Sequence, residues 1–119
     1  MDKVNVLDKF KLFSDHWNPK VAGELNGQQI KLVRFLGEFV WHHHDKEDEF
    51  FYVVKGKFKM HFKDKILEVC ENEFLIVPHG VEHKSVADEE VCAMVFEPKT
   101  TINTGNVENE LTQKILDKL

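Results

Sequence analysis

The stretch "WHHHDKEDEFFYVVKG", Trp41 to Gly56, places three adjacent histidines and an acidic run directly before an apolar segment. It lies inside the chain, where a purification tag would not be expected. If residues 38–44 are extended, alternation turns His42 and His44 to one face of the backbone and His43 to the other. Two imidazoles on one face can bind a single metal ion, whereas a surface histidine run without a role is the alternative.

Two later features favour the metal site. Glu49 opens the apolar segment "EFFYVV", where a buried carboxylate without a partner would cost several kcal/mol, so it requires a cation or a salt bridge to a lysine. Further on, "PHGVEH" forms a tight turn after "FLIV" and brings His83 to the start of the next apolar segment. Alone, His83 would be an ordinary loop histidine. In combination, the sequence predicts a metal site formed by His42, His44, Glu49 and His83.

The remaining pattern predicts an all-β fold. Asn26-Gly27 separates "VAGEL" from "QQIKLVRFL" and is a strong hairpin signal. Residues 57–63 alternate between apolar and cationic or histidine side chains, which is the period of a half-buried strand. Short apolar segments then follow at close spacing without a helix between them. This arrangement predicts an antiparallel sandwich or barrel.

Both ends of the chain show helical spacing. Asn5 can cap an N-terminal helix of about residues 5–13, whose apolar side chains recur at intervals of three and four. In the polar tail, residues 99–119, Leu111, Ile115 and Leu119 would align on one face of a second short helix. We expect this segment to pack on the barrel or to fray at the terminus.

The spacing His42-x-His44-x4-Glu49-x6-Gly56, followed by Pro78-x-Gly80-x2-His83, resembles the two motifs of the cupin superfamily. The sequence departs from the usual pattern at three positions that shape turns, which are Gly37, Asn72 and Ala87. The resemblance implies one jelly-roll domain, a double-stranded β-helix, over residues 1–119 with the barrel at about 21–98 and short terminal helices. Among cupins, the chain looks most like small single-domain proteins of the cupin 2 or mannose-6-phosphate isomerase-like type.

Three imidazoles and one carboxylate leave one or two open positions on an ion that prefers five or six ligands. These donors suit one divalent transition metal, with Mn, Fe, Ni, Co, Zn and Cu all compatible. We therefore expect a metalloenzyme acting on a small polar or anionic molecule, as a sugar-phosphate isomerase or epimerase does. An Fe(II)-dependent dioxygenase and a cupin that only binds or senses a small ligand are the alternatives.

No catalytic base stands out in the sequence. Arg34 shares its strand parity with Ile30, Leu32 and Leu36, so it would point into the barrel if they do. There it could bind an anionic substrate. The alternative is that Arg34 lies at the edge of a strand and pairs with one of the many carboxylates.

The composition limits the partners. A formal charge of −5 and a single arginine argue against nucleic acid, and no apolar run is long enough to span a membrane. We expect a cytoplasmic protein in which Cys70 and Cys92 are reduced thiols. Ten phenylalanines in a short β-rich chain suggest a shared apolar surface and therefore a homodimer.

Overall fold

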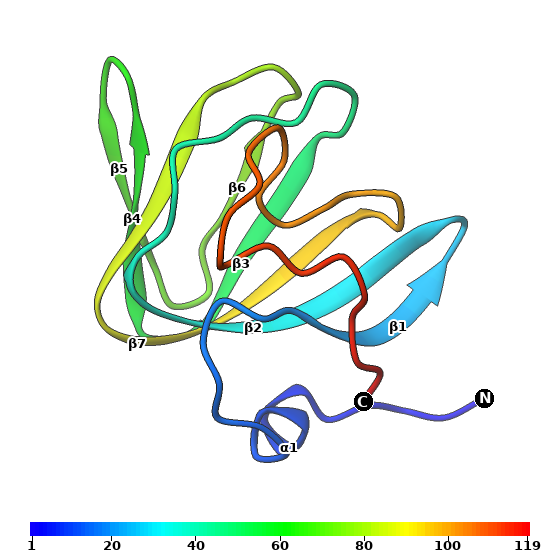
Figure 1. Ribbon diagram of the computed structural model, residues 1–119. Coiled ribbons are helices and arrows are strands. Elements are labelled where there is room, and N and C mark those ends of the chain that lie inside the picture. Colours follow the sequence, from blue (N-terminus) through cyan, green and yellow to red (C-terminus); the bar gives the residue numbers. More distant parts are fainter.

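The computed structural model describes residues 1–119, which form one short helix and seven antiparallel strands. The strands fold into the jelly-roll barrel expected from the sequence, with the helix outside it (Figure 1). The elements in chain order are α1 Val6–Phe10, β1 Lys20–Leu25, β2 Gln28–Glu38, β3 Glu49–Lys55, β4 Lys57–Phe62, β5 Ile66–Cys70, β6 Phe74–Val77 and β7 His83–Pro98.

The longest strand, β7, organises the barrel because it pairs with three others. Its first residues pair with β4, its last residues pair with β3, and β2 runs along its other side. The pairing of β2 with β7 shifts register between Phe35 and Gly37, and Gly37 has φ +83°, which favours glycine. Strand β7 thus passes from one part of the barrel wall to another. Both halves of this strand contribute side chains to the interior.

The inward faces of these strands form one core of thirteen buried side chains. Alternation along β2 and β7 turns Val33 and Phe35, and likewise Ala93 and Val95, toward this interior. The outer face of β2 is covered as well, because Leu32 packs with Phe10 and Cys92 in a separate cluster under α1.

The N-terminal helix is shorter than expected. Asn5 caps it as predicted, and its side-chain oxygen accepts a hydrogen bond of 3.0 Å from the backbone N–H of Asp8. The helix ends at Phe10, and the Arg34 guanidinium donates to the carbonyl oxygens of Phe10 at 2.7 Å and Phe13 at 3.0 Å. These bonds satisfy carbonyls that the helix leaves free at its end.

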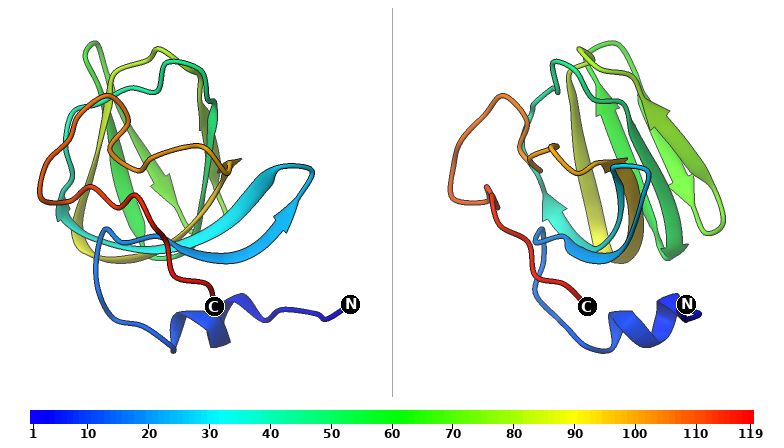
Figure 2. Two further views of the ribbon diagram at one scale, coloured as in Figure 1. Left: turned by 45° about the vertical axis from the view of Figure 1, so that its right-hand side comes forward. Right: turned by 90° about the vertical axis from the view of Figure 1, so that its right-hand side faces the viewer.

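The predicted C-terminal helix is wrong, because residues 99–119 form turns and irregular structure. Side-chain hydrogen bonds hold the backbone in this form: Asn103 donates to the carbonyl of Leu111 at 2.9 Å and accepts from the N–H of Gln113 at 2.8 Å. Such bonds compete directly with helical ones. The chain ends beside β1, where the N–H of Leu119 donates to Val21. Figure 2 shows this tail wrapping around the outside of the barrel.

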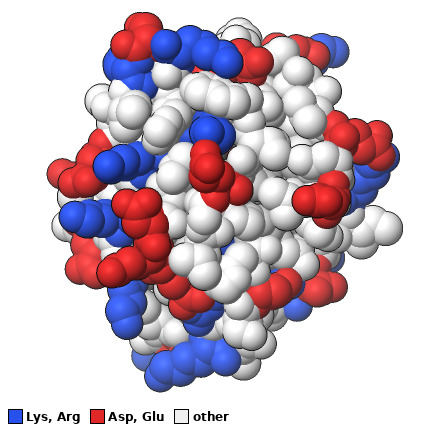
Figure 3. Space-filling view, turned by 60° about the vertical axis from the view of Figure 1, so that its left-hand side comes forward, with Lys and Arg blue, Asp and Glu red and all other residues white.

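The surface carries charges of both signs. On the face shown in Figure 3, acidic and basic side chains are interspersed, and no extended basic patch gathers there. Cys70 and Cys92 are free thiols. No helix has the length and apolar character needed to cross a bilayer.

Because Arg34 fastens the N-terminal segment, we expect Arg34→Met to lower the free energy of unfolding by about 2 to 4 kcal/mol. Chemical denaturation checks this value. Lys11→Met is the control, because the ion pair of Lys11 with Asp8 is exposed and its loss should change stability by less than about 1 kcal/mol. Equal stability of the two variants would contradict the fastening role of Arg34.

Candidate metal centre

One loop and the starts of two strands bring the predicted ligands together. His42 and His44 lie on the loop between β2 and β3, Glu49 is the first residue of β3, and His83 is the first residue of β7. His42 and His83 form an isolated antiparallel bridge with backbone hydrogen bonds of 3.1 and 2.9 Å. The loop is thus extended where the alternation argument requires it, although residues 38–44 do not form a continuous strand.

All four side chains are buried, and their ligand atoms lie within 4.8 Å of one another. Ligands about 2.0 to 2.1 Å from one ion would be separated by no more than about 4.2 Å, so only small shifts are needed for all four to bind it. His43 turns away, as predicted, and contacts Asp45 and Glu82.

Backbone carbonyls fix the orientation of two of the imidazoles. The Nδ1–H group of His42 donates to the carbonyl of Val40 at 2.9 Å, and that of His83 donates to Val81 at 2.8 Å. In the neutral rings, the proton-free Nε2 atoms remain as electron-pair donors. Hydrogen bonding of the second ring nitrogen to a carbonyl is typical of histidines that bind metals.

The arrangement around Glu49 requires a positive charge. Its Oε1 atom lies 2.9 Å from Nε2 of His44 and 3.1 Å from Nε2 of His83. Nε2 of His44 has no hydrogen-bond partner of acceptable geometry, although it is buried. Lone pairs of imidazole and carboxylate repel unless a proton or a cation lies between them. These residues therefore fit a single metal ion.

Burial shapes the acid–base properties of the cluster. Desolvation, reinforced by the nearby His83, lowers the pKa of His42 to about 4, so this ring is neutral at pH 7. Burial opposes the ionisation of Glu49, but the adjoining imidazoles of His44 and His83 outweigh it and hold the pKa of Glu49 well below its ordinary value. A neutral imidazole beside an ionised carboxylate is the state that binds a divalent cation.

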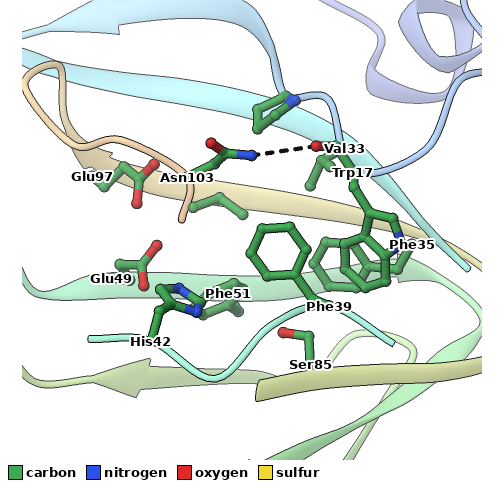
Figure 4. A pocket seen from close by; sticks show the side chains of 12 residues that line it. Trp17, Val33, Phe35, Phe39, His42, Glu49, Phe51, Ser85, Glu97 and Asn103 are labelled. Atoms are coloured by element: carbon green, nitrogen blue, oxygen red, sulfur yellow. Dashed lines mark hydrogen bonds between the residues drawn. The ribbon is translucent and has the colours of Figure 1, made fainter. Parts of the chain in front are cut away.

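A narrow cavity reaches this cluster at His42 and Glu49. It encloses about 420 Å³ of atom-free space including its mouth, of which only about 40 Å³ is wide enough for the centre of a water molecule. Figure 4 shows His42 and Glu49 toward one end and the rings of Trp17, Phe35 and Phe39 toward the other. Trp17 stacks there on Phe35 and Phe39, with ring centroids 4.7 and 4.9 Å apart. Phe39 and Phe51 line the cavity, whereas Phe74 is exposed on the outside and Trp41 is only half-buried.

Arg34 does not line this cavity, contrary to its predicted role in substrate binding. Its side chain lies on the outer face of β2, and its guanidinium also pairs with Glu90 at 2.7 Å. The prediction failed because both faces of β2 are buried, so apolar neighbours on the parity of Arg34 do not indicate the barrel interior. The alternative, a pairing with a carboxylate, describes the observed contact.

Sequence reasoning missed two buried charged residues, Lys31 and Glu97. Their side chains are 2% and 3% exposed and form an ion pair of 2.7 Å, and Glu97 lines the cavity. Burial and the charge of nearby Glu49 raise the pKa of Glu97 well above its ordinary value, and Lys31 opposes this effect. Strand alternation could have indicated their burial. Lys31 lies two residues before Val33 on the inward face of β2, and Glu97 lies two residues after Val95 on the inward face of β7.

The C-terminal tail holds the loop that carries His42 and His44. The side chain of Asn106 accepts from the N–H of His43 at 2.8 Å, and the N–H of Asn106 donates to the carbonyl of His43 at 3.0 Å. Gly105 has φ +57°, and a Cβ atom there would collide with the same carbonyl oxygen. Glycine is therefore required for this close approach.

The low pKa of His42 predicts a pH-dependent stability of the metal-free protein. Because His42 takes up a proton near pH 6.5 when unfolded but only near pH 4 when folded, its contribution is present above pH 6.5 and is lost as the pH falls toward 4. We expect a loss of about 3 kcal/mol relative to His42→Gln.

Denaturation of both proteins at several pH values measures this difference. Comparison with the variant removes the effect of Glu97, whose raised pKa acts in the opposite direction. His61→Gln, a substitution of a histidine outside the cluster, serves as the matched control. A constant difference between the protein and His42→Gln from pH 6.5 to 4 would contradict the prediction.

Comparisons with known proteins agree with this fold. The family model described as a cupin domain matches residues 33–106. A crystal structure of a cupin-2 domain containing protein from Shewanella frigidimarina is 45% identical, covers 81% of this chain and 94% of that one, and has a TM-score of 0.80. The structure of protein NMB1881 from Neisseria meningitidis, at 24% identity, shares the fold over 82% of this chain and 100% of that one, with a TM-score of 0.75.

A curated relative, the uncharacterized protein YdbB of Bacillus subtilis, is 40% identical over 63 residues. This match covers 52% of the present chain and only 56% of YdbB, so it spans about half the length of either protein. The family match alone covers more than half of the chain and includes all four residues of the buried cluster. The chain therefore belongs to the cupin domain family.

Proposed function

We propose that this cupin binds one divalent transition metal ion through His42, His44, Glu49 and His83 and acts as a metalloenzyme on a small molecule that coordinates the ion. The observation that carries this proposal is the convergence of three buried imidazoles on one buried carboxylate, with two of the rings oriented by backbone carbonyls. The donors are nitrogen and oxygen without sulfur, which suits Mn, Fe, Co, Ni, Cu or Zn.

The four protein ligands leave room for a further ligand on an ion that prefers five or six. The cavity begins at His42 and Glu49, so a small molecule held in it would lie against the cluster. When bound, the ion would supply Lewis-acid polarisation of an oxygen of that molecule, or a site for dioxygen if it is iron. The protein's own residues orient the molecule and restrict the access of water.

The cavity wall favours some substrates over others. A phosphate group requires a free cation, but Lys31 is paired with Glu97 and Arg34 lies outside. The sugar-phosphate isomerase suggested by the family resemblance therefore finds little support in the cavity. The aromatic walls around Trp17 and Phe39 suit a compact, partly apolar molecule. We propose hydroxy-carbonyl, diketone or catechol compounds as the substrate class, with oxygenation by Fe(II) as the alternative to isomerisation.

We expect His83→Ala to weaken metal binding by more than about 100-fold, since even the loss of a second-shell partner costs 10- to 100-fold. Equilibrium dialysis against Fe(II), Co(II), Mn(II) and Zn(II) measures the affinity. His79→Ala is the matched control, because His79 belongs to the same turn but its imidazole contacts Asp48 at the surface. Equal binding by the two variants would contradict the assigned ligands.

Turnover separates an enzyme from a binding protein. We expect the metal-loaded protein to convert at least one member of a panel of hydroxy-ketones, diketones and catechols, and Glu49→Ala to abolish the activity. Lack of turnover with every metal, together with recovery of an unaltered small molecule from the purified protein, would instead support a cupin that binds or senses its ligand. Elemental analysis of protein purified without added metal identifies the ion.

The expected homodimer stays a prediction, and the outer face of β3, β6 and β7 offers a surface for it. Phe50 lies there between Ile76 and Phe96 in neighbouring strands, and Phe74 is 60% exposed. We expect light scattering to give the mass of a dimer and Phe74→Lys to shift it toward a monomer, because a second copy would have to bury the lysine. A monomeric mass for the unsubstituted protein would contradict the prediction.

A further inference from the structure

Trp17 has a backbone conformation that bulky residues rarely adopt. Its φ angle is +58°, whereas the other non-glycine residues with positive φ are Asn26 and Asn72, and asparagine tolerates this region. A tryptophan in this conformation is strained, and such strain persists only where the surrounding structure imposes it. The contacts of Trp17 must therefore offset the strain of its backbone.

Two separate parts of the chain hold the backbone of Trp17. Its N–H donates to the carbonyl of Arg34 on β2 at 2.9 Å, next to the isolated bridge between His16 and Arg34. Its carbonyl oxygen accepts a hydrogen bond of 3.4 Å from the side-chain amide of Asn103 in the C-terminal tail. Because the barrel and the tail both bind this residue, the direction in which its side chain leaves the backbone is fixed.

The side chain of Trp17 points into the barrel and closes one end of the cavity. Its indole ring stacks on Phe35 and Phe39, with interplanar angles of 18° and 28°, and the indole N–H donates to the carbonyl of Leu36 at 2.8 Å. Trp17 belongs to the segment between α1 and β1. This end of the cavity is thus closed by a residue from outside the barrel strands.

Aromatic rings connect Trp17 to the metal centre. The ring of Phe39 lies between the two, with its centroid 4.9 Å from that of Trp17 and 5.4 Å from that of the His42 imidazole. Figure 4 shows this order of the three side chains. All three line the cavity together with Glu49. The space available to a molecule held against His42 and Glu49 therefore ends at the indole ring.

We propose that Trp17 is a specificity-determining residue that limits the size of the molecule bound at the metal centre. This inference rests on the metal-binding function proposed above and narrows its substrate class to short aliphatic members, such as small hydroxy-carbonyl and diketone compounds. A ligand with a fused aromatic body would have to displace the indole from its stack and break its hydrogen bond to Leu36. Overpacking of a filled site opposes such a ligand.

The alternative role for Trp17 is core packing alone, because the residue also belongs to the buried core. In that role, its replacement would lower the stability of the fold without changing the preference among ligands. The relative affinities for ligands of different size therefore distinguish the two roles, whereas a loss of stability does not.

Three hydroxamic acids with the same chelating group test the proposal. Acetohydroxamic, benzohydroxamic and 2-naphthohydroxamic acids each coordinate a metal through two oxygens and differ in the size of the attached group. We expect the Co(II)-loaded protein to bind acetohydroxamic acid at least about 10-fold more tightly than 2-naphthohydroxamic acid, a ratio within the range for overpacking an apolar site. The absorption spectrum of the bound Co(II) reports both metal loading and chelator binding.

Trp17→Leu removes the ring and leaves an apolar side chain against Phe35. We expect this variant to bind 2-naphthohydroxamic acid at least about 10-fold more tightly than the unsubstituted protein does, with a change below about 3-fold for acetohydroxamic acid. Trp17→Phe retains a smaller ring and should give an intermediate preference, so it serves as the test if the leucine variant is too unstable to purify.

Phe10→Leu is the matched control. Phe10 is a buried aromatic residue, but it packs with Leu32 under α1 and does not line the cavity. Its substitution should lower stability and retain the full preference for acetohydroxamic acid.

The outcomes separate this inference from the function on which it rests. Failure of the unsubstituted protein to bind Co(II) would overturn the metal-binding function and the inference with it. Binding of Co(II) with equal affinity for the three hydroxamic acids would overturn the role of Trp17 alone. An unchanged size preference in Trp17→Leu or Trp17→Phe would do the same, because another part of the wall would then set the limit.

Discussion

The structure depends on one electrostatic constraint, which is the burial of the Glu49 carboxylate against the imidazoles of His42, His44 and His83. Removing a carboxylate from water costs several kcal/mol unless an opposite charge compensates it. The backbone carbonyls of Val40 and Val81 orient two of the rings so that they cannot use Nδ1 for this purpose. The barrel thus buries a negative charge at one point, which a metal ion would balance.

The cavity beside this point limits the chemistry to small molecules. Its usable space of about 40 Å³ corresponds to a few water molecules, and aromatic rings from separate parts of the chain close one end. Trp17 belongs to the segment before β1, whereas Phe39 follows β2, so the wall is assembled from the N-terminal segment and the barrel together. The N-terminal segment, fastened by Arg34, therefore contributes to the shape of the site although it carries no metal ligand.

Much of the site followed from the sequence because it depends on short-range rules. The alternation of His42 and His44 holds in any extended backbone, and the motif spacing placed Glu49 and His83 at the starts of strands. Arg34 was misplaced because parity identifies two faces of a strand but does not say which one is inside when both are buried. The tail helix failed because the amide of Asn103 bonds to backbone groups eight and ten residues away, a pairing that helical periodicity does not encode. The charges of Lys31 and Glu97 compensate each other across two strands that are far apart in the sequence, so neither residue by itself reveals the ion pair.

The contact between the tail and the metal-binding loop has a kinetic consequence. Gly105 and Asn106 lie against the backbone of His43, between the two ligands on this loop. His42 and His44 therefore cannot swing outward without first breaking two hydrogen bonds to the tail. A bound ion would then be released at a rate limited by the opening of this contact, so the C-terminal region would act as a latch on metal exchange.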